Sequence, residues 1–196
     1  MRAVFLDRDG VINEDEWPTT EWSKFKLIDG AIEAVRKLNE TGMKVIVVTN
    51  QPVIARNLCT EKDIENLHVR MVEEFKANGA KIDAVYFCPH HPETHHKDGN
   101  QTYRIECDCR KPKTGMIEKA VRDFGIELKG SYLVGDSTRE TEMGRKLKQQ
   151  HGKFTTILVK TGYGGTDGNY DAQADYTCND ISDAADKILE LEEGNV

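Results

Sequence analysis

Near its start the chain carries the stretch that decides the fold, RAVFLDRDGVIN, residues 2–13. Its apolar part, residues 3–6, ends abruptly at Asp7, which is typical of a short strand buried on both faces in a parallel sheet. Asp9 follows two residues later, and Gly10 comes next in the turn. Two carboxylates therefore follow a predicted buried strand at its carboxyl end, which is where open parallel sheets bind their ligands.

Strand-like and helix-like segments alternate along the rest of the chain. Further short apolar runs predict strands at residues 43–48, 83–87, 131–134, 154–159 and, less extensive, 175–177. Helical spacing and capping signals, such as Thr60 with Asp63, predict helices at residues 29–41, 60–78, 114–125, 138–150 and 181–192. This alternation predicts an α/β protein, a three-layer αβα, Rossmann-like fold with a mostly parallel central sheet.

Length and composition restrict the classes of function. The 196 residues suit a single domain over residues 1–196, and 38% hydrophobic with 31% charged residues describes a globular protein. The formal charge of −7 argues against broad binding of nucleic acid or membrane surfaces, because both are anionic. No apolar run could span a bilayer and the start of the chain lacks a secretory pattern. We therefore expect a cytoplasmic protein, with a monomer as the working expectation.

Polar residues follow two more of the predicted strands. The second strand leads into Thr49, Asn50 and Gln51, and the fourth leads into Asp136. If the first and fourth strands are neighbours, Asp136 joins the carboxylates of residues 7–9 in one crevice. Clustered carboxylates repel one another unless a cation neutralises them, and hard oxygen ligands with water suit Mg²⁺. The sequence thus predicts a magnesium site at this edge of the sheet.

These residues carry a family resemblance that covers nearly the whole chain. Asp7 to Gly10, Thr49, Lys111 and Asp136 resemble the four motifs of the haloacid-dehalogenase (HAD) superfamily of phosphohydrolases, in order and at the expected strand ends. Within it, the chain resembles the heptose bisphosphate phosphatase group, which includes the similar phosphatase domain of histidinol-phosphate phosphatase. The segments that carry this second resemblance are DRDGVIN (7–13), TNQ (49–51), CPHHP (88–92) and CDCRKP (107–112).

The resemblance implies a HAD-like fold and a role for each motif residue. Asp7 would be the nucleophile that forms an aspartyl-phosphate, and Asp9 the general acid that later activates water as a base. Asp7, the main-chain carbonyl of Asp9 and the Asp136 carboxylate would hold Mg²⁺. Thr49 and Lys111 would bind the phosphoryl oxygens. A proton donor at Asp9 favours phosphate-ester hydrolysis over dehalogenation.

Some of these residues also have a purely structural interpretation. Thr49 could serve only as a strand-end cap, and Lys111 could be a solvated charge. Glu140 lies four residues after Asp136. It either orients Lys111 or a metal-bound water, or it is a charge on the surface of a helix.

Residues 88–112 are predicted to form a long loop that needs something to organise it. Its residues Cys88, His90, Cys107 and Cys109 supply three thiolates and an imidazole, the composition of a closed, structural Zn²⁺ site. His91 is an alternative ligand, but the resemblance indicates His90. We expect this zinc-binding loop, about residues 88–110, to fix Lys111 over the phosphate.

Specificity should come from loops, because the chain has no room for a large cap domain. Arg110 is planar and suits a second phosphate, and the resemblance adds Asp15, Asn50 and Gln51 as substrate contacts. Trp17 and Trp22 could stack on a substrate, but we favour packing against the sheet. The group usually continues TNQ with Ser-Gly where this chain has Pro52-Val53, which leaves the exact sugar open.

The resemblance implies a Mg²⁺-dependent phosphatase that acts on the 7-phosphate of D-glycero-D-manno-heptose 1,7-bisphosphate, on the path to ADP-heptose and lipopolysaccharide core. Histidinol-phosphate phosphatase is the enzymatic alternative. An alternative of another class is a non-catalytic, zinc-stabilised binding module, which the intact set of motif residues disfavours.

Overall fold

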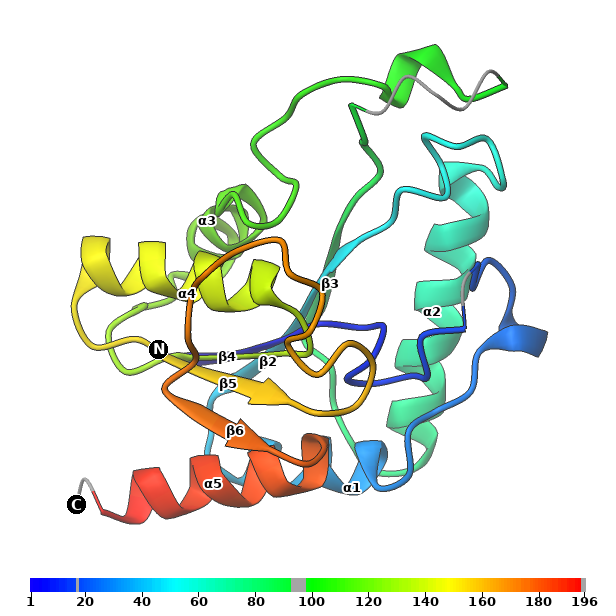
Figure 1. Cartoon of the computed structure of the whole chain (residues 1–196). Coiled ribbons are helices and arrows are strands. Elements are labelled where there is room, and N and C mark those ends of the chain that lie inside the picture. Colours follow the sequence, from blue (N-terminus) through cyan, green and yellow to red (C-terminus); the bar gives the residue numbers. More distant parts are fainter. Residues whose placement is uncertain (17, 93–97, 195–196) are drawn as a thin grey trace.

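A single six-stranded sheet lies at the centre of the molecule (Figure 1). The computed structural model describes residues 1–16, 18–92 and 98–194. All neighbouring strands are parallel, in the order β3-β2-β1-β4-β5-β6. The strands are β1 (Ala3–Leu6), β2 (Lys44–Asn50), β3 (Ala84–Cys88), β4 (Tyr132–Gly135), β5 (Thr155–Val159) and β6 (Tyr176–Cys178). The predicted α/β fold with a mostly parallel sheet is confirmed.

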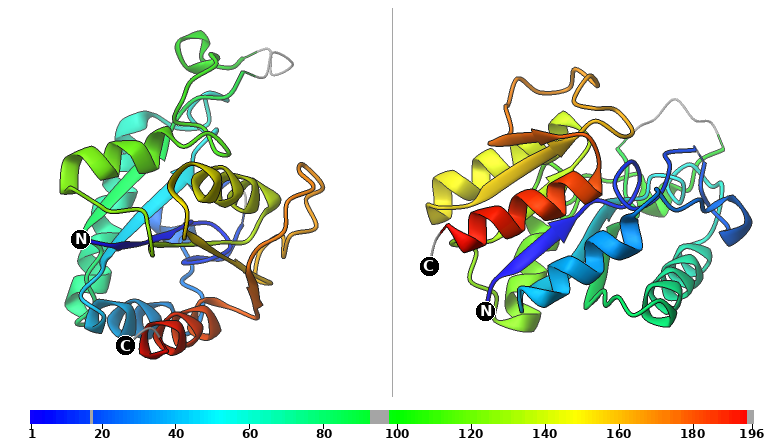
Figure 2. Two further views of the ribbon diagram at one scale, coloured as in Figure 1. Left: turned by 90° about the vertical axis from the view of Figure 1, so that its left-hand side faces the viewer. Right: turned by 90° about the horizontal axis from the view of Figure 1, so that it is seen from below.

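Helices cover both faces of this sheet, which gives the predicted three layers. Figure 2 shows α1 and α5 together on one face and α3 and α4 on the other. The helices are α1 (Ala31–Glu40), α2 (Glu61–Ala77), α3 (Gly115–Phe124), α4 (Thr138–His151) and α5 (Ile181–Glu193). Two short 3₁₀ helices are η1 (Trp22–Lys24) and η2 (Gln101–Tyr103). No helix in the described ranges is both long enough and apolar enough to cross a bilayer.

Each helix begins and ends close to its predicted limits, for local reasons. Thr60 and Asp63 form the predicted capping box at the start of α2, with reciprocal bonds between side chain and backbone. Ser137 and Glu140 form a second capping box at the start of α4, which the sequence analysis did not identify. Gly125 ends α3 in the left-handed conformation that favours glycine.

Alternation along β1 divides the core into two parts. Val4 and Leu6 face the cluster that packs under α1, α2 and α5, whereas Ala3 and Phe5 face the cluster under α3 and α4. All four side chains are fully buried. Burial of each large apolar side chain contributes about 1.5–3 kcal/mol, so β1 is fixed from both faces. The loop that follows β1 therefore starts from a rigid position.

The position of β1 between β2 and β4 gathers the polar strand ends. Leu6 pairs with Val47 on one side and with Val134 on the other. The residues that follow these three strand positions therefore meet at one edge, as predicted. One boundary differs from the prediction. Strand β2 continues through Thr49 and Asn50, because both pair with β3.

Candidate active site

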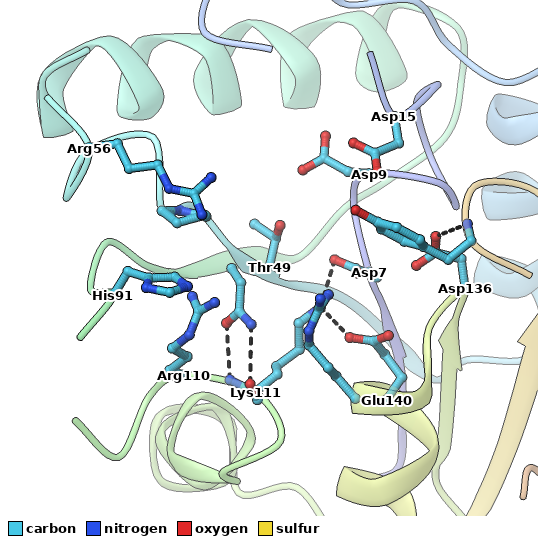
Figure 3. Close-up of a pocket in the computed structure, with 14 residues that line it drawn as sticks. Asp7, Asp9, Asp15, Thr49, Arg56, His91, Arg110, Lys111, Asp136 and Glu140 are labelled. Atoms are coloured by element: carbon cyan, nitrogen blue, oxygen red, sulfur yellow. Dashed lines mark hydrogen bonds and ion pairs between the residues drawn. The ribbon is translucent and has the colours of Figure 1, made fainter. Parts of the chain in front are cut away.

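A cavity of about 310 Å³ lies beyond the carboxyl ends of β1, β2 and β4 (Figure 3). Its walls mix acidic side chains with cationic ones and with a few neutral groups. The lining residues are Asp7, Asp9, Asp15, Thr49, Asn50, Pro52, Arg56, His91, Arg110, Lys111, Asp136, Arg139, Glu140 and Tyr163. Except for Gln51, all the residues predicted for catalysis, phosphoryl binding, magnesium and substrate line this one cavity.

Asp7 directly follows β1 and is only 8% exposed. Its Oδ1 atom lies 2.7 Å from the Lys111 Nζ atom and accepts a hydrogen bond from the Arg8 backbone N–H, also at 2.7 Å. Burial raises the pKa of Asp7 to about 6 although the Lys111 charge opposes the shift, and the charges of Glu140 and Asp9 raise it further. The carboxylate therefore needs nearby positive charge to stay ionised.

Lys111 reaches the cavity from the loop that ends at α3, and its side chain is buried rather than solvated. Its ammonium forms ion pairs with Asp7 and, at 2.8 Å, with Glu140 Oε1. Asn50 holds the Lys111 backbone, because its Oδ1 accepts from the Lys111 N–H at 3.0 Å and its Nδ2 donates to the Lys111 carbonyl at 3.3 Å. The ammonium is thus positioned both by its charge partners and through its own main chain.

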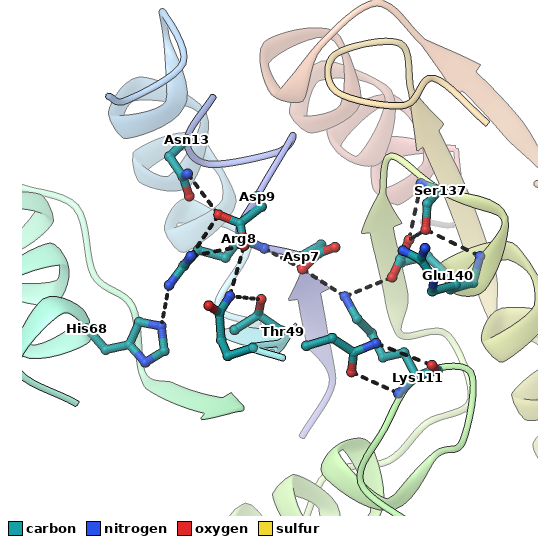
Figure 4. A network of polar contacts seen from close by, with 12 residues as sticks. Asp7, Arg8, Asp9, Asn13, Thr49, His68, Lys111, Ser137 and Glu140 are labelled. Atoms are coloured by element: carbon teal, nitrogen blue, oxygen red, sulfur yellow. Dashed lines mark hydrogen bonds and ion pairs between the residues drawn. The ribbon is translucent and has the colours of Figure 1, made fainter. Parts of the chain in front are cut away.

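Glu140 is 1% exposed, so the reading of this residue as a helix-surface charge is wrong. It closes the capping box through Ser137 and pairs with Lys111 through its other oxygen (Figure 4). Burial alone would raise the pKa of Glu140, but the Lys111 charge and the hydrogen bonds from Lys111 and Ser137 outweigh burial and lower it. Glu140 is therefore an ionised partner that orients Lys111.

Asp136 completes a group of three buried carboxylates. Oxygen atoms of Asp7, Asp136 and Glu140 all lie within 4.8 Å of one another. Burial, with the charges of Asp7 and Glu140, raises the pKa of Asp136 to about 8. Three acidic groups beside the single ammonium of Lys111 leave excess negative charge, and carboxylate oxygens are the ligands that Mg²⁺ prefers. The donor set therefore fits a divalent cation.

The loop after β5 fixes the orientation of Asp136. Its Oδ2 atom accepts a hydrogen bond from the Tyr163 backbone N–H at 2.7 Å, and its carbonyl accepts from the Gly165 N–H at 2.7 Å. Gly162, at φ 62°, passes so close that an added Cβ would lie 2.2 Å from Asp136 Oδ2 and 2.8 Å from the Gly10 Cα atom. Only glycine fits this approach.

Asp9 lies in the cavity wall, but its carboxylate is not part of the three-carboxylate group. It accepts hydrogen bonds from Asn13 Nδ2 at 2.9 Å, from Gln51 Nε2 at 2.8 Å and from the Arg8 guanidinium. Burial would raise the pKa of Asp9, but the Arg8 charge and these hydrogen bonds outweigh burial and lower it. In this arrangement Asp9 is a carboxylate, the form that a general base needs.

Thr49, near the end of β2, and Gln51, just after it, take different positions. Thr49 lines the cavity, and its hydroxyl oxygen accepts from Gln51 Nε2 at 3.0 Å. Gln51 is 2% exposed and does not line the cavity, which corrects its predicted place among the substrate contacts. The chain turns after Asn50, so the Gln51 amide points toward Asp9 and Thr49 instead. Gln51 positions two residues of the site.

Cations line the cavity beyond Lys111. Arg110, which was predicted as a substrate contact, lines it together with Arg56 and Arg139, which were not identified from the sequence. His91, considered from the sequence only as an alternative zinc ligand, also lines it. Burial lowers the pKa of Arg110, and the neighbouring Arg139 and Arg56 charges lower it further. Arg139 lies over the Tyr163 ring, with its Cζ atom 5.8 Å from the ring centroid. These cationic side chains favour an anionic ligand on their side of the cavity, although the chain as a whole is acidic.

The cavity-lining residues that were not predicted have few features in the sequence that indicate a functional site. Arg56 and His91 lie in loops, and Arg139 looks like an ordinary charge in the first turn of a helix. Tyr163 lies between Gly162 and Gly164 in the loop after β5 and belongs to no predicted motif. Each enters the cavity because of tertiary folding, and Asp15, which was predicted, lines the wall beside Asp9 (Figure 3).

The four predicted zinc ligands form one cluster, which lies where β3 leads into the long loop. The sulfur atoms of Cys88, Cys107 and Cys109 are 3.2–3.5 Å apart, and His90 Nδ1 lies 3.4 Å from Cys109 Sγ. A tetrahedral site with Zn–S bonds of about 2.3 Å has sulfur atoms about 3.8 Å apart, so the donor atoms are already gathered and need to separate by only about half an ångström. Hydrogen bonds from Cys88, His90 and Cys107 outweigh burial and lower the pKa of Cys109 to about 5. The donor set fits zinc, with His90 rather than His91 in the cluster.

The aromatic residues predicted to pack against the sheet divide into two cases. Trp22 stacks on Phe25 with ring centroids 5.0 Å apart, and Arg70 lies 5.1 Å from its ring. It packs against the apolar core, as expected. Trp17 lies outside the described residues, as do His95 and His96.

Comparisons with known proteins agree on one group of enzymes. Residues 6–190 match the family model described as polynucleotide kinase 3 phosphatase. The D-glycero-beta-D-manno-heptose-1,7-bisphosphate 7-phosphatase of Pasteurella multocida is 37% identical over 182 residues, 93% of this chain and 94% of the relative. The enzyme of the same name from Escherichia coli K12 is 38% identical over 186 residues, 95% of this chain and 93% of the relative.

Solved structures agree with these sequences. The D,D-heptose 1,7-bisphosphate phosphatase from B. bronchiseptica, complexed with magnesium and phosphate, has a TM-score of 0.79 and 28% identity. It covers 97% of this chain and 99% of its own. A HAD-like phosphatase from Mesorhizobium loti has a TM-score of 0.78 and 27% identity, and it covers 98% of this chain and 87% of its own.

Proposed function

The chain belongs to the polynucleotide kinase 3 phosphatase family and to the heptose bisphosphate phosphatases among its relatives, and from this premise we propose its substrate and mechanism. It is a phosphoric monoester hydrolase of the HAD type. Its substrate is D-glycero-β-D-manno-heptose 1,7-bisphosphate, from which it releases the 7-phosphate with Mg²⁺. The observation that carries this proposal is the contact of Lys111 with both Asp7 and Glu140 in a cavity that Asp136 also lines.

Asp7 is the nucleophile in this proposal. Its carboxylate attacks phosphorus, and the bond to the sugar oxygen breaks, which leaves an aspartyl-phosphate. Lys111 lies 2.7 Å from Asp7 and places positive charge where phosphoryl oxygens arrive. Thr49 lines the same wall and offers its hydroxyl to a phosphoryl oxygen.

Asp7 and Asp136, with the main-chain carbonyl of Asp9, would hold the Mg²⁺ ion. When bound, the ion supplies charge neutralisation for the nucleophile and the phosphate. Glu140 completes the group of close carboxylates, but its pairing with Lys111 assigns it chiefly to orienting that ammonium. Without positive charge from both sources, the carboxylates would repel an incoming phosphate dianion.

Asp9 serves both chemical steps as acid and then as base. As acid it protonates the departing sugar oxygen, and as base it takes a proton from the water that hydrolyses the aspartyl-phosphate. Its hydrogen bonds from Arg8, Asn13 and Gln51 hold it ionised before substrate arrives. The acid step therefore needs a proton that arrives with the substrate or from solvent.

Arginine side chains on one wall of the cavity suit a substrate that carries a second phosphate. Lys111 is held beside the nucleophile Asp7 by its ion pairs with Asp7 and Glu140. Its charge therefore serves the reacting phosphate. Arg110 and Arg56 lie on the same wall of the cavity, where a second phosphate would meet two guanidinium groups (Figure 3). Arg110 also donates to the His90 carbonyl at 3.2 Å, which ties this wall to the Cys/His cluster. We assign Zn²⁺ to that cluster as a structural ion.

Release of inorganic phosphate from a panel of substrates tests the proposal. The panel contains the heptose bisphosphate, histidinol phosphate, an oligonucleotide 3′-phosphate and p-nitrophenyl phosphate, each with and without Mg²⁺. We expect the highest kcat/KM for the heptose bisphosphate and strict dependence on Mg²⁺. A preference for histidinol phosphate or for the oligonucleotide would overturn the substrate assignment. No turnover on any substrate would indicate a non-catalytic binding module.

A further inference from the structure

Arg8 is a fully buried cation beside the proposed acid–base residue. Its side chain is 1% exposed, and its guanidinium forks onto Asp9, with Nη2 at 2.8 Å and 3.0 Å from the two carboxylate oxygens and Nε at 3.1 Å from Oδ1. The remaining nitrogen, Nη1, lies 3.0 Å from His68 Nε2 (Figure 4). The Arg8 Cζ atom also lies 5.8 Å from the Phe25 ring centroid.

His68 can only accept in this contact. Arginine has donors and no acceptors, so Nε2 of His68 is the unprotonated nitrogen and Nδ1 carries the proton. His68 is 4% exposed, and its ring meets Phe87 edge-on with centroids 5.3 Å apart. Burial, together with the Arg8 charge, lowers the pKa of His68 to about 3, so the ring stays neutral near physiological pH. The imidazole is thus a fixed acceptor packed against apolar surface.

The contact gives Arg8 Nη1 a hydrogen-bond acceptor, which Asp9 does not provide because it binds Nε and Nη2. A buried guanidinium with an unsatisfied N–H group is costly, and rotation of the fork toward another acceptor would misalign it on Asp9. Asn13 and Gln51 bind the same carboxylate, but neither restrains Arg8 in the described contacts. His68 does not line the cavity and cannot touch substrate. It can act only through Arg8.

We propose that His68, on α2, is a positioning residue for Asp9. By accepting from Arg8 Nη1, it holds the guanidinium in the two-point contact that fixes Asp9 as a correctly aimed carboxylate. That form is the one that acts as base on the water that hydrolyses the aspartyl-phosphate. The inference rests on the proposed function, because it assumes the two-step mechanism through Asp7.

The two steps give this role a distinct kinetic signature. With p-nitrophenyl phosphate, whose nitrophenolate leaving group needs no proton, formation of the aspartyl-phosphate does not depend on Asp9 as acid. If Asp9 is misplaced, hydrolysis of the aspartyl-phosphate then slows while its formation proceeds. The phosphorylated enzyme then accumulates, and kcat and KM fall together while kcat/KM is preserved. A purely structural role for His68 would lower stability without changing the fraction of phosphorylated enzyme.

His68→Leu removes the acceptor at similar side-chain volume, and His68→Gln restores an acceptor at the position of Nε2. Met71→Leu is the matched control, because Met71 is fully buried on the same helix and has no polar contact with Arg8. The readouts are steady-state kcat and KM with p-nitrophenyl phosphate, and the phosphorylated fraction after acid quench. We expect kcat to fall about 10- to 100-fold in His68→Leu with phosphoenzyme accumulation. His68→Gln should recover most of the activity, and Met71→Leu should match the wild type.

Unchanged kcat in folded His68→Leu overturns the inference. So does a loss in which kcat and kcat/KM fall equally without phosphoenzyme, because the first step would then be affected. If His68→Leu does not fold, Arg8→Lys tests the same point, since one ammonium cannot hold both Asp9 and His68, and it should accumulate phosphoenzyme too. Failure of the wild-type protein to hydrolyse any substrate would instead overturn the proposed function.

Discussion

The Lys111 ammonium lies 2.8 Å from Glu140 Oε1, and the two residues are 3% and 1% exposed. They come from different elements, the long loop before α3 and the first turn of α4. Since a buried charge without a partner is strongly disfavoured, each residue depends on the other. The pair therefore connects the loop that carries Lys111 to the helix that follows Asp136.

Glu140→Gln tests this pair without disturbing the helix start, because glutamine also serves at the third position of a capping box. We expect kcat to fall about 10- to 100-fold, since Lys111 would lose one of its two charge partners and shift. The free energy of unfolding should fall by about 1–3 kcal/mol. Glu142→Gln is the control on the same helix. Its ion pairs are partly exposed, so it should change stability by less than about 1 kcal/mol. Equal effects of the two variants would contradict the pairing role.

Asp7→Asn should abolish turnover while the protein stays folded. An amide at this position is a poor nucleophile and cannot form a stable phosphoenzyme, so we expect a loss of at least about 10⁴-fold in kcat. The measurement is phosphate release together with circular dichroism. Asp186→Asn, an exposed change outside the cavity, serves as control and should behave as wild type. Substantial residual turnover in Asp7→Asn would refute the nucleophile assignment.

The raised pKa of Asp136 predicts a pH dependence of stability. Burial and its acidic neighbours raise this pKa from 3.8 to about 8, so the native protein binds this proton more tightly than the unfolded chain does. The free energy of unfolding of Mg²⁺-free protein should therefore fall as the pH rises through this window. Thermal unfolding from about pH 6 to about pH 8.5 measures the slope, which should be shallower in Asp136→Asn. Because protons and Mg²⁺ compete, stabilisation by added Mg²⁺ should grow with pH.

Much of the fold and of the site follows from local sequence features. Each strand is a short apolar run, and the polar residues after β1, β2 and β4 mark one edge of the sheet. Asp7 and Asp136 could be placed at that edge because parallel strands end there together. Lys111, which follows no strand, was placed there by the family resemblance and by the predicted zinc-binding loop. The Cys/His cluster could be predicted because those residue types rarely gather in a loop for another reason.

The rest depends on tertiary contacts that local patterns do not encode. For Glu140 the sequence left two interpretations open, a partner of Lys111 or a charge on a helix surface, and only the contact with Lys111 from another loop decides between them. The family resemblance placed Gln51 among the substrate contacts, but the turn after β2 directs its amide toward Asp9. His68 looks like an ordinary residue on an amphipathic helix, and only the path of Arg8 makes it a partner. Such pairs join positions far apart in the sequence.

Removal of zinc should disorder the loop that carries Lys111. Cys107→Ser removes one thiolate of the cluster, whereas Cys178→Ser changes a cysteine outside it and is the matched control. We expect the first variant to lose bound zinc, to become protease-sensitive within residues 98–112, and to lose most of its activity. Lys111 lies two residues beyond Cys109, so loss of the cluster releases it from Asp7. Full activity in protein verified to be zinc-free would contradict this role.

Arg110→Gln separates recognition of the second phosphate from catalysis. Glutamine is uncharged and ends two bonds short of the guanidinium nitrogens, so contact with an anion weakens while Lys111 and Asp7 stay in place. We expect kcat/KM for the heptose 1,7-bisphosphate to fall about 10- to 100-fold, which is the strength of hydrogen bonds to a charged group. For heptose 7-phosphate, which lacks the second phosphate, kcat/KM should change no more than about threefold. Zinc content is measured in the same samples, because Arg110 also binds the His90 carbonyl. Arg145→Gln, on the exposed side of α4, is the control for a lost positive charge. Equal losses on both substrates with zinc retained would place Arg110 in the reacting centre instead.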